Sequence, residues 1–339
     1  MTNENDKPVR FLLLALPEAS PAVLYGIYEV LSSIGTVWTE LTGQAEPGRA
    51  VEVKVVGEQA GTIPTTLGFP ITAEFGLAEA GQADVVIVPD LAISKDEDPR
   101  DRWPAVRSWL VAQARGGACI TSVCSGSVLL AASGLLDCKE ATTHWAFTDL
   151  FRRFFPKVLL RSERVLCPAG DGHMVVTSGG SAAWSDLVLY LIARFVGRAR
   201  AVHAAKVFLL GDHSDGQLPF SAMIRPHHHE DAVIDRCQSW IAENYLVSRP
   251  VERMIEHSGL SPRTFKRRFR AATGYTPLDY VQLVRIEEAK QLLETTDLPI
   301  DTVSSEIGYE DPAFFRRLFR RHAGITPSRY RQRFRVSLG

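Results

Sequence analysis

Cys124 and His144 are the residues of the N-terminal half that could support a reaction. Cys124 follows the apolar run ACITSV and precedes SGS, a pattern typical of a strand that turns into a helix. The free N–H groups of a helix N-terminus can lower the pKa of a thiol placed there and favour the nucleophilic thiolate. His144 lies 20 residues later, in ATTHW, where it could act as a base. Each residue alone is also a common packing residue, so the pair indicates chemistry only within a suitable fold.

A second group of candidate residues is a set of arginines in two similar segments near the C-terminus. Residues 259–280 (GLSPRTFKRRFRAATGYTPLDY) and 309–330 (YEDPAFFRRLFRRHAGITPSRY) share nine identical residues at a constant spacing of 50. The Ser-Pro of the first segment and the Asp-Pro of the second can each cap a helix and occupy its first turn. Phenylalanines at i and i+4 predict a buried stripe, and most of the arginines lie off it. The repeat therefore predicts two capped helices, each with a basic face.

A shorter helical segment and a glycine turn precede each basic helix, with the sequences PVERMIEHSGL and PIDTVSSEIGY. A short helix, a tight turn and a capped basic helix form a helix-turn-helix, whose second helix enters the DNA major groove. The basic face of one amphipathic helix is more often only solvated. Two copies with the same turn and cap favour DNA binding instead. The sequence therefore predicts double-stranded DNA as a partner.

The charge distribution agrees with this prediction. The 339-residue chain has a net charge of −1, but residues 231–339 carry 18 Lys and Arg against 14 Asp and Glu. No apolar run approaches the ~18 residues of a membrane span. Residues 1–10 are polar, and the apolar run 11–16 that follows is too short for the core of a signal peptide. We therefore expect a cytoplasmic protein with no membrane partner. The five cysteines contain no CxxC pair and do not suggest a disulfide framework.

Strands and helices alternate through the N-terminal part of the chain. The apolar, β-branched runs are short, and helical patterns of about 10–15 residues separate several of them. This order predicts an α/β fold, in which a mostly parallel sheet has helices on both faces. The strands are expected at 11–16, 51–57, 84–90, 116–124 and 141–145, with more strands within 158–170 and 173–180. The helices are expected at 21–34, 103–115, 125–136 and 181–197.

The stretch 211–231 interrupts this alternation. It is rich in Gly, Pro, Asp and His and has no periodicity, so we expect a linker between a first domain, 1–210, and an all-α domain, 232–339. His227–His229 lie in this linker. Consecutive residues of a loop rarely converge on one metal ion, so we expect no metal at these histidines. We also expect no cofactor.

The C-terminal motifs resemble those of the AraC-type DNA-binding domain. The resemblance covers about 232–335 and includes G-x-x-P-x-x-Y at Gly274–Tyr280 and at Gly324–Tyr330. It also includes R-x-x-x-A-x-x-L-L at Arg285–Leu293, in the helix that joins the two motifs. The resemblance implies that the two capped basic helices, called the reading helices below, enter two successive major grooves. The residues implied to face bases are Arg263, Lys266, Arg267, Ala313, Arg316 and Arg317, and those implied to face phosphates are Arg270, Arg320 and Arg321.

Cys124 and His144, in their strand and helix setting, make residues 10–198 resemble the ThiJ/PfpI branch of the class I glutamine-amidotransferase-like fold. The resemblance implies a flavodoxin-like sheet. Catalytic members usually place a carboxylate on the first helix and Gly-Gly where backbone N–H groups stabilise an oxyanion. The corresponding positions here are Val23 and Asp90-Leu91. A carboxylate at position 90 would repel a developing negative charge, so we expect no enzyme activity and regard Cys124 and His144 as vestigial.

The two domains together resemble the GlxA-type transcriptional regulators. That resemblance implies a homodimer formed through the N-terminal domain, RNA polymerase as a further candidate partner, and a small nitrogenous effector such as an amino acid, carnitine or a betaine. Asp90 with Trp145 or Trp184 would suit a cation. The alternative is an amidase or glyoxalase-like enzyme that uses Cys124 and has an accessory DNA-binding tail. The expected pocket residues are Asp90, Cys124, Ser125, His144, Trp145, Ser178 and Trp184.

Overall fold

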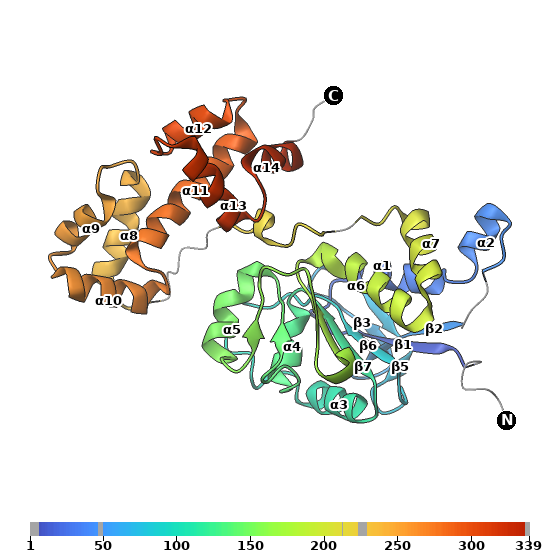
Figure 1. Ribbon diagram of the computed structural model, residues 1–339. Coiled ribbons are helices and arrows are strands. Elements are labelled where there is room, and N and C mark those ends of the chain that lie inside the picture. The colour runs from blue at the N-terminus through green and yellow to red at the C-terminus, as the bar shows by residue number, and fades with distance from the viewer. Residues whose placement is uncertain (1–6, 47–49, 212, 223–228, 336–339) are drawn as a thin grey trace. The chain divides into compact units, whose positions relative to one another are not determined.

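The computed structural model describes residues 7–46, 50–211, 213–222 and 229–335. The chain divides into two compact units, Met1–Gln217 and Leu218–Gly339 (Figure 1). The division therefore falls within the stretch 211–231, which the sequence assigns to a linker.

The first unit is built on a sheet of seven strands. Neighbouring strands are parallel except at one edge, where Leu166–Ala169 pairs antiparallel with Val175–Ser178. The inner strands are almost wholly buried, as their continuous apolar runs require. The prediction of a mostly parallel sheet is confirmed. In spatial order the strands are β10 (Leu166–Ala169), β11 (Val175–Ser178), β7 (Cys119–Val123), β6 (Val85–Val88), β1 (Val9–Leu14), β2 (Val51–Gly57) and β5 (Phe75–Gly76).

Helices cover both faces of this sheet, which gives the predicted flavodoxin-like arrangement. The helix α1 (Pro21–Ser32) packs on β2 and on α6 (Trp184–Leu191), whereas α3 (Pro104–Arg115) and α4 (Gly126–Ala132) pack on β7 and on each other. In Figure 1, α1 and α6 lie on the opposite side of the sheet from α3.

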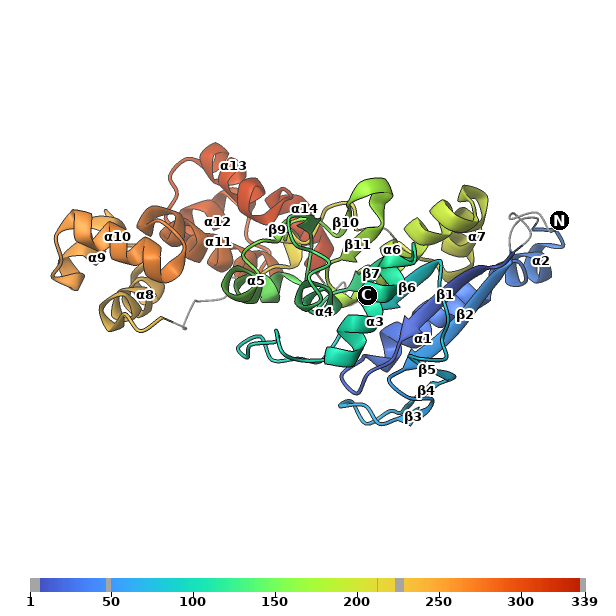
Figure 2. The same ribbon diagram turned by 90° about the horizontal axis from the view of Figure 1, so that it is seen from below.

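The remaining elements of the first unit surround this core. The strands β3 (Gly61–Ile63) and β4 (Ile71–Ala73) pair antiparallel, and Figure 2 shows them beside β5. A π-helical turn, Ile192–Val196, continues α6 toward α7. The other elements are α2 (Val37–Thr42), β8 (Glu140–Ala141), α5 (Thr148–Phe154), β9 (Leu159–Leu160) and α7 (Arg198–Phe208).

The strand predicted at 141–145 is wrong beyond its first residue, because β8 ends at Ala141. The next residues satisfy their polar groups through side chains instead of a strand neighbour. The Thr142 N–H donates to Thr177 Oγ1 (2.7 Å), and the Thr143 carbonyl accepts a hydrogen bond from Gln217 Nε2 (2.9 Å). Gln217 is only 4% exposed. The first part of the expected linker therefore belongs to the core of the first unit.

The second unit is entirely helical within its described residues and has two hydrophobic cores. One core lies among the first three helices, the other lies among the last three, and the 19-residue central helix contributes to both. The two predicted helix-turn-helix modules therefore have separate cores. The first module comprises the first three helices of this unit, and the second module comprises the last three. None of the helices in the described ranges of the chain is long and apolar enough to cross a membrane. The helices are α8 (Ala232–Asn244), α9 (Pro250–Ser258), α10 (Pro262–Thr273), α11 (Pro277–Thr295), α12 (Ile300–Glu306), α13 (Pro312–Ala323) and α14 (Pro327–Phe334).

The sequence repeat is also a structural repeat. Ser261 caps α10 and Asp311 caps α13, each by accepting a backbone N–H with its side chain. Both helices end at a left-handed glycine, Gly274 (φ 79°) and Gly324 (φ 76°), a conformation that a residue with a Cβ adopts only with strain. The aromatic side chains of the two cores also correspond, with centroid distances of 5.3–5.7 Å between successive rings.

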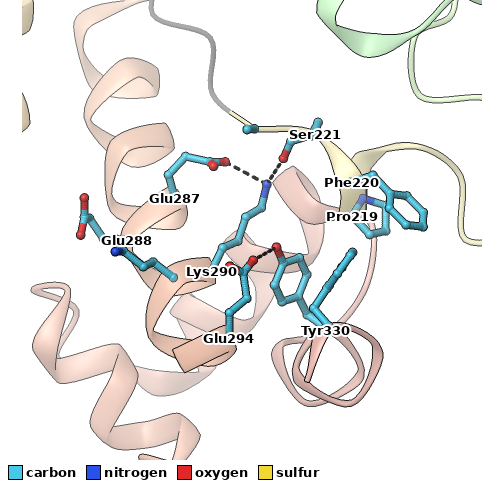
Figure 3. A pocket seen from close by; sticks show the side chains of 11 residues that line it. Pro219, Phe220, Ser221, Glu287, Glu288, Lys290, Glu294 and Tyr330 are labelled. Carbon is cyan, nitrogen blue, oxygen red and sulfur yellow. Dashed lines mark hydrogen bonds and ion pairs between the residues drawn. The ribbon is translucent and has the colours of Figure 1, made fainter. Parts of the chain in front are cut away.

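Residues 218–221 pack on the second module rather than extending freely from it. The Phe220 ring meets the Phe334 ring edge to face (5.4 Å between centroids). Lys290, which is 5% exposed, donates to the Ser221 carbonyl (2.6 Å) and to Glu287 (2.8 Å), beside a hollow of about 390 Å³ (Figure 3). This part of the expected linker is therefore a fixed segment of the second unit.

The other end of the expected linker is attached to the first module. Arg268 binds both carboxylate oxygens of Asp231 (2.6 and 2.8 Å), and Asp231 also caps α8. This pairing with the Arg268 guanidinium lowers the pKa of Asp231. His229 is close to Gln238 (2.7 Å), whereas His227 and His228 lie outside the described residues. The described residues contain no group of three His, Cys, Asp or Glu side chains that could hold a metal.

Candidate DNA interface and ligand site

The helices α10 and α13 expose the side chains expected to contact DNA. Phe265 and Phe269 bury one face of α10, and Phe315 and Phe319 bury the corresponding face of α13. The opposite faces are left to solvent because the arginines fall off the aromatic stripe. All nine expected contact residues are exposed, namely Arg263, Lys266, Arg267, Arg270, Ala313, Arg316, Arg317, Arg320 and Arg321.

Three of these residues line one hollow in the first module. Lys266, Arg267 and Arg270 lie around a volume of about 650 Å³, whose other lining residues are Val251 and the segment 276–278. Its lining is thus basic on one side and apolar on the other. A surface of this kind can contact a phosphate with its charged part and a sugar or thymine methyl with its apolar part.

Two residues of the reading helices have roles that the sequence analysis did not predict. Arg268 faces the Asp231 carboxylate instead of joining the basic surface. Its position in the repeat gives the signal, because the residue 50 positions later, Leu318, lies on the buried side of α13. Arg316 forms an ion pair with Asp301 of α12, and this is the only carboxylate ion pair recorded for the nine contact residues within the described part of the chain.

In the first unit, the candidate site lies at the carboxyl edge of the parallel strands, where such sheets usually bind ligands. Cys124 follows β7 in a left-handed conformation (φ 54°), and its backbone N–H donates to the Ser178 carbonyl (2.9 Å). This is the strained turn expected for a residue between a strand and a helix. The Cys124 side chain is nevertheless buried, with 5% exposure.

The position of Cys124 before a helix N-terminus does not lower the pKa of its thiol. Burial raises the pKa of its thiol to about 11, and the nearby Asp90 charge adds to this effect. The following helix has only seven residues and does not compensate for the lost solvation. The thiol is therefore protonated near neutral pH, where a nucleophile would need the thiolate.

Asp90 is half-buried beside the thiol, and burial raises the pKa of this carboxyl. One carboxylate oxygen accepts a hydrogen bond from Ser181 Oγ (2.9 Å), which itself lies 3.6 Å from Cys124 Sγ. The other carboxylate oxygen is buried and has no hydrogen-bond partner within the described residues. The Ser181 and Ser20 side chains both act against burial by lowering the pKa of Asp90. Ser181 was missed by the sequence analysis, although it lies just beyond β11 at the same edge of the sheet.

Ser125 and Ser178 connect parts of the fold. Ser125 Oγ accepts from the Leu91 N–H (2.8 Å) and donates to the Leu91 carbonyl (2.7 Å). Ser178 Oγ donates to the Ser122 carbonyl (3.2 Å). Both serines are almost fully buried, at 3% and 0% exposure. The Leu91 N–H is thus already bonded and is not free to stabilise an oxyanion, and Val23, on α1, supplies no carboxylate.

The aromatic residues and the histidine are not arranged as a catalytic group. His144 accepts a hydrogen bond from the Ala146 N–H (3.1 Å), and burial lowers the pKa of its ring. Within the described residues there is no hydrogen bond between His144 and Cys124. The Trp145 ring lies 5.0 Å from the His144 ring, between centroids. Trp184 packs against Gly26 of α1, where an added Cβ would lie only 3.2 Å from the indole.

Comparisons with known proteins assign both units. The DJ-1/PfpI family matches residues 35–193, and a helix-turn-helix domain matches residues 254–333. The HTH-type transcriptional regulator CdhR of Pseudomonas aeruginosa is 28% identical over 289 residues, which cover 82% of this chain and 80% of the relative. The HTH-type transcriptional regulator GlxA of Rhizobium meliloti is 30% identical over 226 residues, which cover 65% and 67%.

A solved structure agrees with the fold of the first unit. A ThiJ/PfpI family protein from Pseudomonas syringae superimposes with a TM-score of 0.50 at 16% identity, and the match covers 76% of this chain and 94% of that protein. The curated relatives are regulators of transcription, and they confirm the prediction of a regulator rather than an enzyme. The chain belongs to the GlxA-type transcriptional regulators, in which a DJ-1/PfpI domain is joined to an AraC-type helix-turn-helix domain.

Proposed function

We propose that this regulator binds a specific DNA sequence by inserting α10 and α13 into successive major grooves. The observation that carries the proposal is the exposure of all nine contact residues on two helices with the same caps and the same aromatic core. Arg267 and Arg317 would read guanine with their planar guanidinium groups. Arg270, Arg320 and Arg321 would bind phosphates, which position the protein without specifying the sequence.

The first unit, in this proposal, senses a small nitrogenous metabolite at Asp90. Its support is the half-buried carboxylate with one unpartnered oxygen, because an ammonium group would supply the missing partner. The ring of Trp145, which is half-buried near the same edge of the sheet, would favour a cation further. The protonated thiol of Cys124 supports ligand contact rather than covalent chemistry.

The proposal includes a homodimer formed through the first unit, a cytoplasmic location and RNA polymerase as a further partner. Leu41 of α2 and Val202 of α7 support the dimer, because these helices pack together and expose apolar side chains (69% and 51%). Light scattering on the full chain and on a Leu41→Glu/Val202→Glu variant tests it. The variant should be monomeric, and a dimer that survives both substitutions would place the interface elsewhere.

Thermal unfolding with a panel of amino acids, carnitine and betaines tests the sensor. A ligand at 100 times its Kd should stabilise the full chain by about 2.7 kcal/mol. Asp90→Asn is the matched variant, because it keeps the shape and the hydrogen bond from Ser181 but removes the charge. We expect this variant to lose the shift caused by a cationic ligand. An unchanged shift would exclude Asp90 as the anionic partner.

A further inference from the structure

The ion pair between Asp301 and Arg316 joins the two helices of the second helix-turn-helix. Asp301 lies on α12 and Arg316 on the exposed face of α13, and one guanidinium nitrogen of Arg316 contacts Asp301 Oδ1. Both side chains remain largely open to solvent, at 62% and 49% exposure. Exposed ion pairs add little to folding stability, so any larger effect of this pair must arise when another molecule binds there.

The first module has a different pair at the corresponding positions. Subtracting 50 places Val251 opposite Asp301 and Lys266 opposite Arg316. Val251 cannot form an ion pair, and no carboxylate partner is recorded for Lys266 among the described residues. The two modules have similar caps and cores. Within the part of the chain that the structure describes, they differ in that only the second has a carboxylate, Asp301, paired with a side chain expected to face bases.

We propose that Asp301 is a positioning residue that determines base specificity in the second module by orienting the Arg316 guanidinium toward guanine. The inference rests on the proposed entry of α13 into the major groove. A guanidinium has five N–H donors in a planar fork, so it can keep a contact to Asp301 while other donors face O6 and N7 of one base. A lysine ammonium has no such fork, which fits the lack of an acidic partner for Lys266 among the described residues.

The negative charge of Asp301 has a second effect. Near the DNA backbone a carboxylate is repelled by phosphates, so Asp301 lowers the affinity for every sequence. It also discourages Arg316 from turning toward a phosphate, because Arg316 would then leave its ion-pair partner. Asp301 should therefore lower the affinity for DNA in general and raise the discrimination between sequences. A merely structural residue would not change these two quantities in opposite directions.

The test uses the full-length protein and a random-sequence duplex library, from which the preferred site is selected. Affinities for that site and for a shuffled duplex are then measured with the wild type, Asp301→Ala, Arg316→Ala and the double variant. We expect Asp301→Ala to lower the ratio of specific to non-specific affinity by about three- to tenfold, as part of the roughly 10- to 100-fold supplied by a good bidentate contact. Its affinity for the shuffled duplex should rise.

The double variant shows whether Asp301 acts through Arg316. Adding Asp301→Ala to Arg316→Ala should leave the specificity ratio unchanged, because the side chain to be positioned is gone. A further loss would overturn the proposal, since Asp301 would then contact DNA directly. Asp301→Glu, which keeps the charge, should restore part of the ratio, whereas Asp301→Asn should restore less.

Glu306→Ala is the matched control. Glu306 is exposed on the same helix, and no ion pair with Arg316 is recorded for it within the described ranges. Its removal should raise non-specific affinity without changing the selected bases. If Glu306→Ala lowered the ratio of specific to non-specific affinity as much as Asp301→Ala does, the proposal would be overturned. If Arg316→Ala lowers the ratio and Asp301→Ala does not, the inference alone fails. If the wild type selects no site, the proposed function fails with it.

Discussion

In the second unit the nine expected contact residues are exposed on two helices, whereas in the first unit Cys124, Ser125 and Ser178 are buried. The arginines of the DNA surface have few partners within the protein. The buried residues of the first unit bond to the backbone of neighbouring strands and loops. The exposed cationic side chains of the second unit are therefore available for binding, whereas the small buried side chains of the first unit connect parts of its fold.

This difference predicts how each unit responds to substitution. Removing an exposed arginine should change DNA affinity and leave the free energy of unfolding nearly constant, because few protein contacts are lost. Changing the size of a buried residue in the first-unit site should change stability first, because its neighbours are backbone atoms that cannot move independently.

The largest expected effect is the dependence of DNA binding on salt. Between 50 and 200 mM salt we expect the affinity of the full chain to fall by about 10²- to 10⁴-fold, because each neutralised phosphate contributes roughly −0.9 to the logarithmic slope. Fluorescence anisotropy with a labelled duplex measures this slope. An affinity independent of salt would mean that the exposed arginines do not face the phosphate backbone.

Gly126→Ala should cause the next largest effect, in the first unit. A Cβ at this position would lie 2.3 Å from the Pro89 carbonyl oxygen and 2.9 Å from that of Val88. Because both are backbone atoms, we expect a loss of at least about 3 kcal/mol in unfolding free energy. Urea unfolding followed by tryptophan fluorescence reports on this unit, which holds five of the six tryptophans.

Two observations would show that Gly126→Ala acts as expected. DNA binding by the second unit should be retained, since its cores contain no residue of the first unit. Ser133→Ala, a substitution at the other end of α4, is the control and should cost much less, since Ser133 is not fully buried. Full stability of Gly126→Ala would show that the turn at Cys124 tolerates movement.

Arg267→Ala and Arg317→Ala should each lose about 1–3 kcal/mol of discrimination, in different halves of the site about one DNA turn apart. Arg320→Ala should weaken binding evenly across sequences and reduce the salt slope by about one. Selection from random duplexes, repeated with each variant, separates these results. Equal and uniform losses for Arg267→Ala and Arg320→Ala would refute the division into base and phosphate contacts.

The second unit could be predicted closely from the sequence because its signals are local. Ser261 and Asp311 cap the helices that follow them, and Gly274 and Gly324 end those helices, all within single segments of the chain. The buried stripe also follows from local spacing, since Phe265 and Phe269 are one helical turn apart. The ion pair of Asp301 was not predicted, because it depends on how two helices pack.

The first unit was predictable in its sheet but not in the chemistry of its site. Apolar runs mark the strands, whereas the pKa of Cys124 depends on burial by segments distant in the sequence. Gln217 illustrates the same limit, since it lies in a stretch with no periodicity and yet donates to the carbonyls of Thr143 and Arg164. The local sequence pattern does not indicate that Gln217 packs into the core of the first unit.

Cys124→Ser should have the smallest effect. Serine has nearly the shape of cysteine, and Ser181 Oγ lies close enough to Cys124 Sγ (3.6 Å) to pair with a hydroxyl in its place. We expect the unfolding free energy to change by less than about 1 kcal/mol and basal DNA binding to stay constant. Glutaminase, peptidase and glyoxalase assays should show no appreciable turnover by the wild type. Turnover that disappears in Cys124→Ser would contradict the sensor assignment.

The thiol itself gives a sharper measurement, with Cys138 as an exposed comparison in the same chain. Because burial raises the pKa of Cys124 to about 11, its thiolate fraction at pH 7 should be about 10²-fold below that of an ordinary thiol with a pKa of about 8.5. Iodoacetamide should therefore modify Cys138 first, as peptide mass spectrometry can measure. The Cys124 rate should keep rising with pH toward 11. Rapid modification of Cys124 at pH 7 would mean that the site stabilises a thiolate, and the contrast between an exposed binding surface in one unit and a buried, unreactive site in the other would no longer hold.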